Sequence, residues 1–444
     1  MNQASPRLDA DVGSAATRGG GYAWYVVAVL TLFYILSFVD RQILNLLVDP
    51  IRAHYGLSDT QISLLQGLSF VFFYSTLGVP IAWLADRSHR RNIIVVGVVF
   101  WSLMTAMCGL APTFLLLFLY RMGVGAGEAA LVPAAYSMFS DYFGKEDLGR
   151  ATSFFQAGGF FGAGLAMMVG GAAVAAAQSL DIVAAIGLAP WQSVFLLVGI
   201  PGLLLAPLLF TIREPVRYDG ARLADGTAPT LAETLAFVRS RRACLGSIFV
   251  GFSLLCMVGY SSLAWLPSFL IRTHGLTPAQ AGFSYGAVFC IFSTLGVISG
   301  GAVAARLLRR GVNDAALVAA LFSAAGLLPS MAVLPFIESV PLLMVAIAAS
   351  TFFVCLPFGI APAAIASLTP NRLRAQVSSV YIFLLNVIGL AVGATLVALV
   401  TDYYFADADQ VGASLAIVGC SATLLAAIVL AWGRPHLRNA MTAR

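Results

Sequence analysis

Residues 119–133 read Leu119-Tyr-Arg-Met-Gly-Val-Gly-Ala-Gly-Glu-Ala-Ala-Leu-Val-Pro133 and place two opposite charges inside a long apolar segment. Arg121 and Glu128 are two helical turns apart, so their side chains lie on one face of an α-helix. An ionisable group at membrane depth is costly unless it is paired or lines a wet cavity. This stretch therefore predicts a membrane-spanning helix that carries a functional site.

A second pair of charges lies in the first apolar run of the chain, residues 22–48. Asp40 and Arg41 are adjacent there, well inside the run. We call Asp40, Arg41, Arg121 and Glu128 the charge quartet. Buried ion pairs stabilise a fold weakly and are expensive to retain, which favours a functional role over a static ion-pair network that merely joins two helices.

The composition of the chain is that of a polytopic membrane protein. Of its 444 residues, 60% are hydrophobic and 10% are charged, and the mean hydropathy is +0.90. A membrane-spanning helix needs roughly 20 apolar residues. Strands of a barrel would be shorter and would alternate in polarity. Twelve sufficiently long runs predict an all-α fold with helices near residues 22–48, 60–83, 92–111, 113–140, 148–177, 190–212, 242–271, 278–305, 314–336, 340–368, 373–401 and 411–433.

The basic residues indicate how the chain is oriented. If the N-terminus is cytoplasmic, 21 of the 25 Lys and Arg residues fall in cytoplasmic segments, as the positive-inside rule requires. The net charge of +5 thus reports membrane topology and not nucleic-acid binding. We expect cytoplasmic termini and five segments: a tail (1–21), a first six-helix bundle (22–212), a cytoplasmic linker (213–241), a second six-helix bundle (242–433) and a tail (434–444).

Several function classes lack the residues that they need. The six cysteines are scattered singly through apolar runs without metal-ligand spacing, so no metal site and no cofactor are expected. The region before residue 22 lacks the apolar core of a signal peptide. A lipid-modifying enzyme would need a nucleophile and base or a metal centre, but all four histidines lie in predicted loops or tails. We therefore expect a chain with no catalytic residues.

The predicted loop after the second helix contains Ala82-Trp-Leu-Ala-Asp86-Arg87-Ser-His-Arg90-Arg91. It resembles the Gly-x-x-x-Asp-Arg-x-Gly-Arg-Arg/Lys motif of the major facilitator superfamily, although Ala82 and His89 replace the two motif glycines. In that family the acid latches the two halves of the transporter on the cytoplasmic side. The resemblance assigns gating roles to Asp86, Arg87, Arg90 and Arg91.

The second half of the chain repeats features of the first half. Residues 301–310 reproduce the leading glycine and the three basic positions of that motif, with Ala305 in place of the acid. Pro133-Ala-Ala followed by Arg150-Ala reappears as Pro362-Ala-Ala followed by Arg374-Ala. A parallel repeat of six helices is typical of the major facilitator architecture, whose substrate site lies near the midplane between the halves. We include Arg150 among the gating residues.

The charge quartet resembles that of one subfamily within this superfamily. Asp40-Arg41 together with Arg121-x-x-x-Gly-x-Gly-Glu128-Ala resembles the Spinster subfamily, whose members move lysophospholipids and sphingosine-1-phosphate-like lipids, partly with proton coupling. Because no strand precedes residues 123–127, their glycines indicate close helix packing and not a dinucleotide loop. The glycine-rich stretch 158–164 is similar to a motif of drug-proton antiporters, but Leu165 stands where the motif has proline.

The second half is almost free of charge at membrane depth. It offers aromatic residues, which would suit the hydrocarbon tail of an amphiphile whose anionic head binds the charged first half. The alternative is that a given phenylalanine merely faces lipid or packs against a neighbouring helix. We predict proton coupling by Asp40 and Glu128 and substrate binding by Arg41, Arg121, Tyr260, Tyr285, Phe292, Phe358, Tyr381 and Asn386.

The resulting hypothesis is a monomeric secondary transporter in a bacterial inner membrane. It would move a lysophospholipid or a sphingosine-1-phosphate-like amphiphile, with proton coupling, by alternating access. A carboxylate must carry the proton because no histidine lies at membrane depth. We expect Arg41 and Arg121 to bind the anionic group of the substrate and also to pair with Asp40 and Glu128. The alternatives are a proton-coupled symporter of small organic anions, a multidrug antiporter and, from a different class, a membrane sensor that transports nothing.

Overall fold

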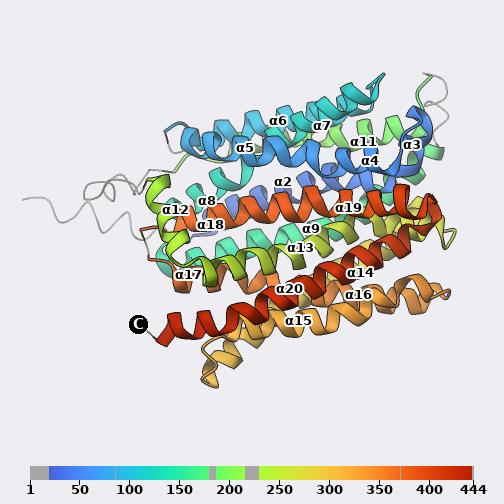
Figure 1. The fold of residues 1–444 in the computed structure, drawn as a ribbon. Helices are drawn as coiled ribbons and strands as arrows, with labels where there is room; N and C mark the ends of the chain where they lie inside the picture. Colours follow the sequence, from blue (N-terminus) through green and yellow to red (C-terminus); the bar gives the residue numbers. More distant parts are fainter. Residues whose placement is uncertain (1–19, 86, 180–186, 216–229, 371, 443–444) are drawn as a thin grey trace, which may run out of the picture.

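The protein is a bundle of long helices, described by a computed structural model for residues 20–85, 87–179, 187–215, 230–370 and 372–442. Twelve of its helical segments are long and apolar enough to cross a membrane, and the described residues contain no strand. The predicted all-α, twelve-helix fold is confirmed. In Figure 1 the helices run roughly parallel, with α12 and the end of α20 at one end of the bundle and α3 at the other.

The first half contains six spans. They are α2 (Gly21–Leu46) with the short α3 (Val48–Tyr55), α4 and α5 (Asp59–Gln66, Leu68–Ala85), α6 (Arg90–Cys108), α7 and α8 (Phe114–Glu128, Leu131–Tyr142), α9 (Lys145–Ser179), and α11 with η1 (Pro190–Leu205, Ala206–Thr211). The sequence Ser58-Asp-Thr-Gln61 forms the expected capping box at the start of α4.

The second half also contains six spans, after the linker helix α12 (Leu231–Ser240). They are α13 (Arg242–Arg272), α14 (Pro278–Arg309), α15 with η3 (Ala315–Ala332, Leu334–Phe336), α16 with η4 and α17 (Val340–Cys355, Leu356–Gly359, Ala361–Leu368), a composite helix eleven, and α20 (Val411–Thr442), which follows η7 (Ala408–Gln410). Helix eleven joins α18 (Arg374–Leu385), the π-helical η5 (Asn386–Val392), α19 (Gly393–Leu399) and the π-helical η6 (Val400–Phe405).

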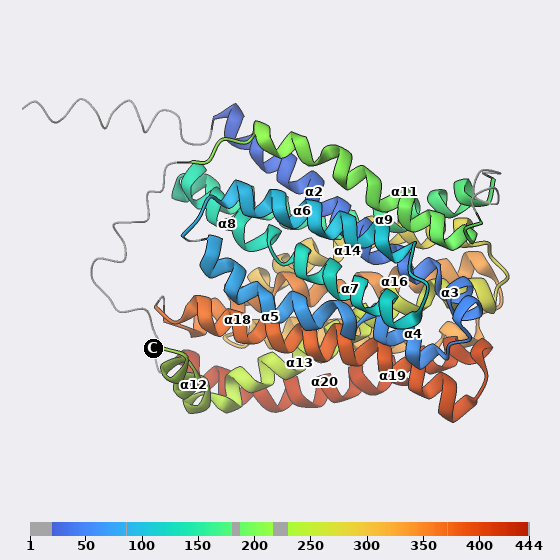
Figure 2. The same ribbon diagram turned by 90° about the horizontal axis from the view of Figure 1, so that it is seen from above.

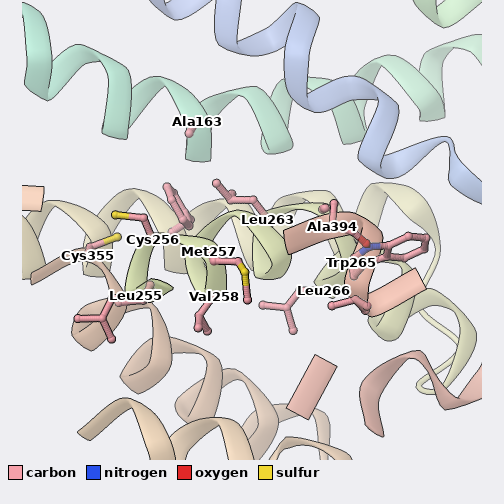
Figure 3. Close-up of a cluster of buried hydrophobic side chains, with 14 of the residues drawn as sticks. Ala163, Leu255, Cys256, Met257, Val258, Leu263, Trp265, Leu266, Cys355 and Ala394 are labelled. Carbon is pink, nitrogen blue, oxygen red and sulfur yellow. The ribbon is translucent and has the colours of Figure 1, made fainter. Parts of the chain in front are cut away.

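The two halves lie side by side, with helices α2, α6, α8 and α11 on one side of the bundle and α13, α18, α19 and α20 on the other (Figure 2). They meet where α9 packs on α14, where α4 packs on α19 and where α2 packs on α13. Figure 3 shows part of the core around α13, where Leu255, Met257 and Val258 are buried. α13 is covered over most of its length, and it packs on α2, the helix that carries Asp40 and Arg41.

We call the end with α12 the inner end and the end with α3 the outer end, in keeping with the expected orientation. The start of α2 and the end of α20 both lie at the inner end (Figure 1). Several glycines allow the helices to approach closely. A Cβ atom at Gly125 of α7 would lie 2.4 Å from the Phe70 carbonyl oxygen, and one at Gly127 would lie 2.8 Å from the Gly97 carbonyl oxygen. The interpretation of these glycines as packing residues is confirmed.

Candidate functional site

The charge quartet is assembled where α2 crosses the end of α7. Glu128 is the last residue of α7, and the helix restarts at Leu131 as α8. Pro133 contributes to this break because it has no N–H to donate to the carbonyl group of Ala129. Asp40, Arg121 and Glu128 are all buried, at 3%, 0% and 2% exposure. The structure therefore brings together the four charged residues that the sequence singled out.

Arg41 and Glu128 form the ion pair of the quartet. The Arg41 guanidinium donates to Oε2 of Glu128, and the side chains are 15% and 1% exposed. Three aromatic rings surround the same guanidinium, with centroids 4.2 Å away for Phe70, 4.9 Å for Phe38 and 5.5 Å for Tyr74. Such rings attract a cation through their negative faces. Arg41 is thus held by one carboxylate and by an aromatic cage from α2 and α5.

Arg121 binds the backbone of α2 and not a carboxylate. Its guanidinium donates to the carbonyl oxygen of Asp40 at 2.9 Å and to that of Arg41 at 3.4 Å. This contact fixes the part of α2 that carries both charged residues of the first span. Of the two predicted carboxylate pairings, Arg41 with Glu128 is present, whereas Arg121 reaches Asp40 only through its backbone.

The Asp40 carboxyl group lies beside Trp101 and Thr105 of α6. Among the described residues it forms no ion pair. Oε1 of Glu128 and Nε of Arg41 are also buried without a hydrogen-bond partner in the described part of the chain. The quartet therefore contains unused hydrogen-bonding capacity, which a bound proton, water molecule or ligand can satisfy.

A cavity of about 20 Å³ lies next to Arg41, between the two halves. This volume suits about one water molecule. The first half supplies Phe38, Arg41, Gln42, Asn45 and Gln66, and the second half supplies Tyr260, Leu263, Ala264, Leu390 and Ala394. The amide side chains Gln42, Asn45 and Gln66 were missed by the sequence analysis. Asn45 could have been found, because it follows Arg41 by four residues, the spacing that places two side chains on one face of a helix.

The predicted substrate-binding residues of the second half lie in four different places. Tyr260 lines the cavity beside Arg41, and its ring lies 6.5 Å from that of Phe358, which contacts Phe160 of the first half at 5.3 Å. Tyr285 and Tyr381 are buried in the core against Phe289 and Phe249. Asn386 opens the π-helical segment η5, whose Gly389 packs on Tyr260.

Phe292 lies elsewhere, in an apolar groove of about 610 Å³ between α14 and α16. Its neighbours there include Val288, Leu295, Phe352 and Phe353. The structure therefore brings Tyr260 and Phe358 toward the charge quartet but leaves Tyr285, Tyr381 and Phe292 outside the cavity next to Arg41.

The inner-end arginines bind within the first half. Arg90 is buried and donates to Asp141 on α8 and, at 2.8 Å, to Glu214 after η1. Burial raises the pKa of Glu214, but hydrogen bonds from the Arg91 backbone N–H and the Arg90 guanidinium outweigh it and hold that pKa below its ordinary value. Arg90 thus ties α6 to α8 and to the segment after η1.

The other predicted gating residues make looser contacts. The Arg87 guanidinium lies 3.8 Å from the centre of the Trp83 ring, and the exposed Arg150 binds Asp147 at 3.3 Å. Asp86 lies outside the described residues. The gating role of all five residues stays a prediction.

A charge-inverted counterpart of the Arg90 cluster occurs in the second half. Asp314, before α15, accepts from Arg434 at 2.6 Å and from Arg438 at 2.9 Å, both on α20. Burial raises the pKa of Asp314, but these two guanidinium groups overcome it and hold the pKa low. An arginine joins spans three and six in the first half, and an aspartate joins spans nine and twelve in the second half.

The outer end is closed by ionic contacts between the halves. Arg272 of α13 donates to Asp49 at 2.8 Å and to both oxygens of Asp59 at 2.7 and 2.9 Å. Asp402 accepts from the backbone N–H of Thr60 at 2.6 Å, at the N-terminus of α4. A carboxylate is favoured there by the helix dipole. The sequence analysis did not single out Arg272, Asp59 or Asp402, because nothing in their local sequence reveals partners in the other half.

The described residues contain no cluster of three potential metal ligands among His, Cys, Asp and Glu. The site thus consists of charged, amide and aromatic side chains, which can bind an anion, exchange a proton or form hydrogen bonds.

Comparison with known proteins agrees with this architecture. An MFS-type efflux pump of Mycolicibacterium smegmatis is 28% identical over 431 residues, which cover 96% of this chain and 95% of the pump. The probable L-galactonate transporter of Escherichia coli is 30% identical over 298 residues, or 64% of this chain and 62% of that transporter.

Among solved structures, a bacterial homolog of the human lysosomal transporter Spinster, in an inward-facing and unoccupied conformation, matches with a TM-score of 0.78 and 25% identity. The match covers 96% of this chain and 99% of that one, and it confirms the expected similarity to Spinster. The sequence model of the Major Facilitator Superfamily matches residues 30–394. Both the fold and this match indicate an integral membrane transporter and not an enzyme, and the chain belongs to the Major Facilitator Superfamily.

Proposed function

We propose that this protein moves an amphiphile with an anionic head group across the bacterial plasma membrane, coupled to protons, by alternating access. Lysophospholipids and sphingosine-1-phosphate-like lipids are the substrate class. The observation that carries the proposal is the Arg41–Glu128 ion pair, buried at the junction of α2 and α7 near the Asp40 carboxyl group, which forms no ion pair with any described residue. The resemblance of the charge quartet to the Spinster subfamily supports this substrate class, and the fold of a bacterial Spinster homolog matches this chain.

Competition for Arg41 provides the coupling. When Glu128 binds a proton, the carboxylate partner of Arg41 is lost and the guanidinium becomes available to an anionic head group. When the substrate leaves, Arg41 favours the ionised form of Glu128 and promotes release of the proton. Asp40 is the second carboxyl group at this depth, and Arg121 holds the backbone of both Asp40 and Arg41 in place. Protonation and substrate binding are thus linked through one arginine.

The tail of the amphiphile would contact the second half. Tyr260 and Phe358 of that half form an aromatic surface next to the cavity beside Arg41, and Phe160 of α9 continues this surface. We place both termini in the cytoplasm, following the distribution of basic residues, and we expect the monomer to be the transporting unit.

A small organic anion is the second candidate substrate. The similarity to the probable L-galactonate transporter favours it. The amide groups of Gln42, Asn45 and Gln66 at the cavity also suit a hydroxylated acid, because amides both donate and accept hydrogen bonds. A multidrug substrate is the third candidate, supported by the similarity to the mycobacterial efflux pump.

Flux measurements in proteoliposomes separate these candidates. Under an imposed pH gradient, we expect the wild type to move a lysophospholipid or a sphingoid phosphate and expect Glu128→Gln to lose the response to the gradient. Glu146→Gln, the same change at an exposed carboxylate of the inner end, is the matched control. Movement of L-galactonate without movement of either lipid would replace the amphiphile by a small anion. Movement of a cationic dye alone would replace it by a drug.

A further inference from the structure

A proline in α13 leaves one backbone acceptor without its helical donor at the interface between the two halves. Pro267 lies inside this helix and has no N–H. The carbonyl group of Leu263, four residues earlier, therefore lacks the donor that an α-helix normally provides. At membrane depth an unsatisfied carbonyl group is costly, because no water is present to bind it. The helix must obtain a donor from another element.

The first half supplies these donors. Nδ2 of Asn45, from α2, donates to the Leu263 carbonyl oxygen at 3.0 Å. Nε2 of Gln66, the last residue of α4, donates to the carbonyl oxygen of the next residue, Ala264, at 3.1 Å. Asn45 and Gln66 are 7% and 6% exposed. Two amide groups of one half thus bind two adjacent carbonyl groups of the other.

The hydrogen bonds among the amides have a defined direction. A carbonyl oxygen can only accept, so the amide nitrogens of Asn45 and Gln66 must point at α13. Gln66 then donates to Oδ1 of Asn45 at 3.1 Å, and Asn45 donates to Oε1 of Gln42 at 2.7 Å. The chain of bonds runs from Gln66 of α4 through Asn45 to Gln42, which follows Arg41 directly. It connects the interface with the cavity beside the ion pair.

From this arrangement we infer that Asn45 and Gln66 are positioning residues for alternating access, which hold the outer part of the interface closed through the Leu263 and Ala264 carbonyl groups. We call the four residues the amide latch. When the outer end opens, both amides lose these acceptors and the Leu263 carbonyl group loses its donor, so these groups must be hydrated together. A ligand that draws Arg41 and Gln42 from their present positions would weaken the latch through Gln42. The inference requires only alternating access and does not depend on which substrate is carried.

The segment after α4 packs closely on helix eleven beside the amide latch. Gly67, which follows Gln66, lies against η5 so closely that a Cβ atom would be 2.7 Å from the Leu390 carbonyl oxygen. Leu390 and Ala394 line the same cavity as Gln66. Trp265 of α13 donates to the Ala394 carbonyl oxygen at 2.9 Å, a contact visible in Figure 3. The second-half side of the latch is therefore braced by helix eleven.

Hydrogen–deuterium exchange of the full-length protein in nanodiscs tests the inference without any substrate. Asn45→Ala leaves the Leu263 carbonyl group without its donor, which we expect to shift the equilibrium toward the outward-open state by roughly tenfold. Peptides from α4 and the outer half of α13 should exchange faster, and peptides from α18 and the inner part of α9 should exchange more slowly. A merely structural role would raise exchange at both ends.

Pro267→Ala provides the decisive comparison. Its new N–H can bind the Leu263 carbonyl group, so Asn45→Ala should change exchange much less in this background than in the wild type. Ser262→Ala is the matched control, because the Ser262 hydroxyl group binds only the Val258 carbonyl oxygen of its own helix. Equal effects of Asn45→Ala in both backgrounds, or faster exchange at both ends, would overturn the inference.

Discussion

Arg41 of α2 binds the carboxylate of Glu128, the residue at which α7 ends, across 87 positions of sequence. In the described part of the chain neither side chain forms another ion pair. Removal of one member of a buried pair leaves the other charge uncompensated, which costs about 3–5 kcal/mol, whereas removal of both members is often nearly neutral. This relationship allows the structural contribution of the pair to be separated from its role in transport.

Glu128→Gln alone is therefore expected to lower the free energy of unfolding by about 3–5 kcal/mol. The double variant Arg41→Gln/Glu128→Gln should recover most of that loss. Both variants should lack proton-dependent transport. Thermal unfolding in detergent and flux in proteoliposomes measure the two effects. A double variant that is less stable than the single variant would contradict the pairing.

Arg121→Lys preserves the positive charge but loses the planar guanidinium that reaches two carbonyl groups of α2. We expect stability to fall by about 1.5–3 kcal/mol, the usual contribution of a hydrogen bond to a charged group. Thermal unfolding checks this expectation. Arg150→Lys should leave the midpoint unchanged, because Arg150 is exposed and surface pairs contribute about 0–1 kcal/mol. Equal midpoints for both variants would show that the carbonyl contacts are not needed.

Arg272→Ala should open the outer end. The change leaves Asp59, which is fully buried, without its strongest partner and removes the contact with Asp49. Ser63→Cys places a thiol on α4, where Ser63 contacts Thr395 of α19. With Arg272→Ala added, this thiol should react faster with a maleimide from outside than it does in the Ser63→Cys protein alone. The Arg272→Ala protein without this cysteine corrects for labelling of native thiols. Arg52→Ala is the control, since Arg52 is more exposed and lies 3.7 Å from Asp59. Unchanged labelling would mean that other contacts keep the outer end closed.

Acid should destabilise the inner end of the first half. The folded-state pKa of Glu214 lies below its ordinary value, so its contribution to stability is present above the unfolded-state pKa of about 4.3 and is lost as the pH falls through the folded-state pKa. Thermal midpoints recorded from about pH 7 down to about pH 3 should fall more steeply for the wild type than for Glu214→Gln. Glu146→Gln removes an exposed carboxylate and should retain the wild-type profile. Parallel profiles for wild type and Glu214→Gln would contradict the assignment.

Gly125→Ala tests the close contact between α5 and α7. The added Cβ atom would lie 2.4 Å from the Phe70 carbonyl oxygen, so the helices must separate, at an expected cost of about 1–3 kcal/mol. Gly78→Ala, on α5, meets no atom within 4 Å and should be neutral or slightly stabilising, because alanine favours helices over glycine. Yield and thermal midpoint distinguish the two variants. Equal yields and midpoints would show that α7 can move away freely.

Much of the fold could be predicted because its signals are local. Runs of apolar residues specify membrane-spanning helices, and the capping box at Ser58 marks where α4 begins. The charge quartet could be recognised because ionisable groups are costly in hydrocarbon wherever the helices pack. The glycines of α7 likewise predicted a close contact with another helix, although not which helix it would be.

The pairing of these residues could not be predicted in the same way. The sequence predicted that Arg41 lies among the carboxylates, but it did not reveal the aromatic cage that Phe38 of α2 and Phe70 and Tyr74 of α5 form around it. Arg121 was expected to bind a carboxylate and instead holds the backbone of α2. Tyr285 and Tyr381 resemble Tyr260 in sequence terms, yet only Tyr260 lies at the cavity.

The sequence by itself determined the number of spans, their charge asymmetry and the presence of four buried charges. Only the tertiary structure decided which charges meet, and it alone placed Asn45 against the Leu263 carbonyl group and Arg272 against Asp59. The reason is physical. Hydropathy, helix capping and the cost of buried charge depend on a residue and its near neighbours, whereas a hydrogen bond between helices depends on their relative positions and rotations, which the packing of the whole bundle sets.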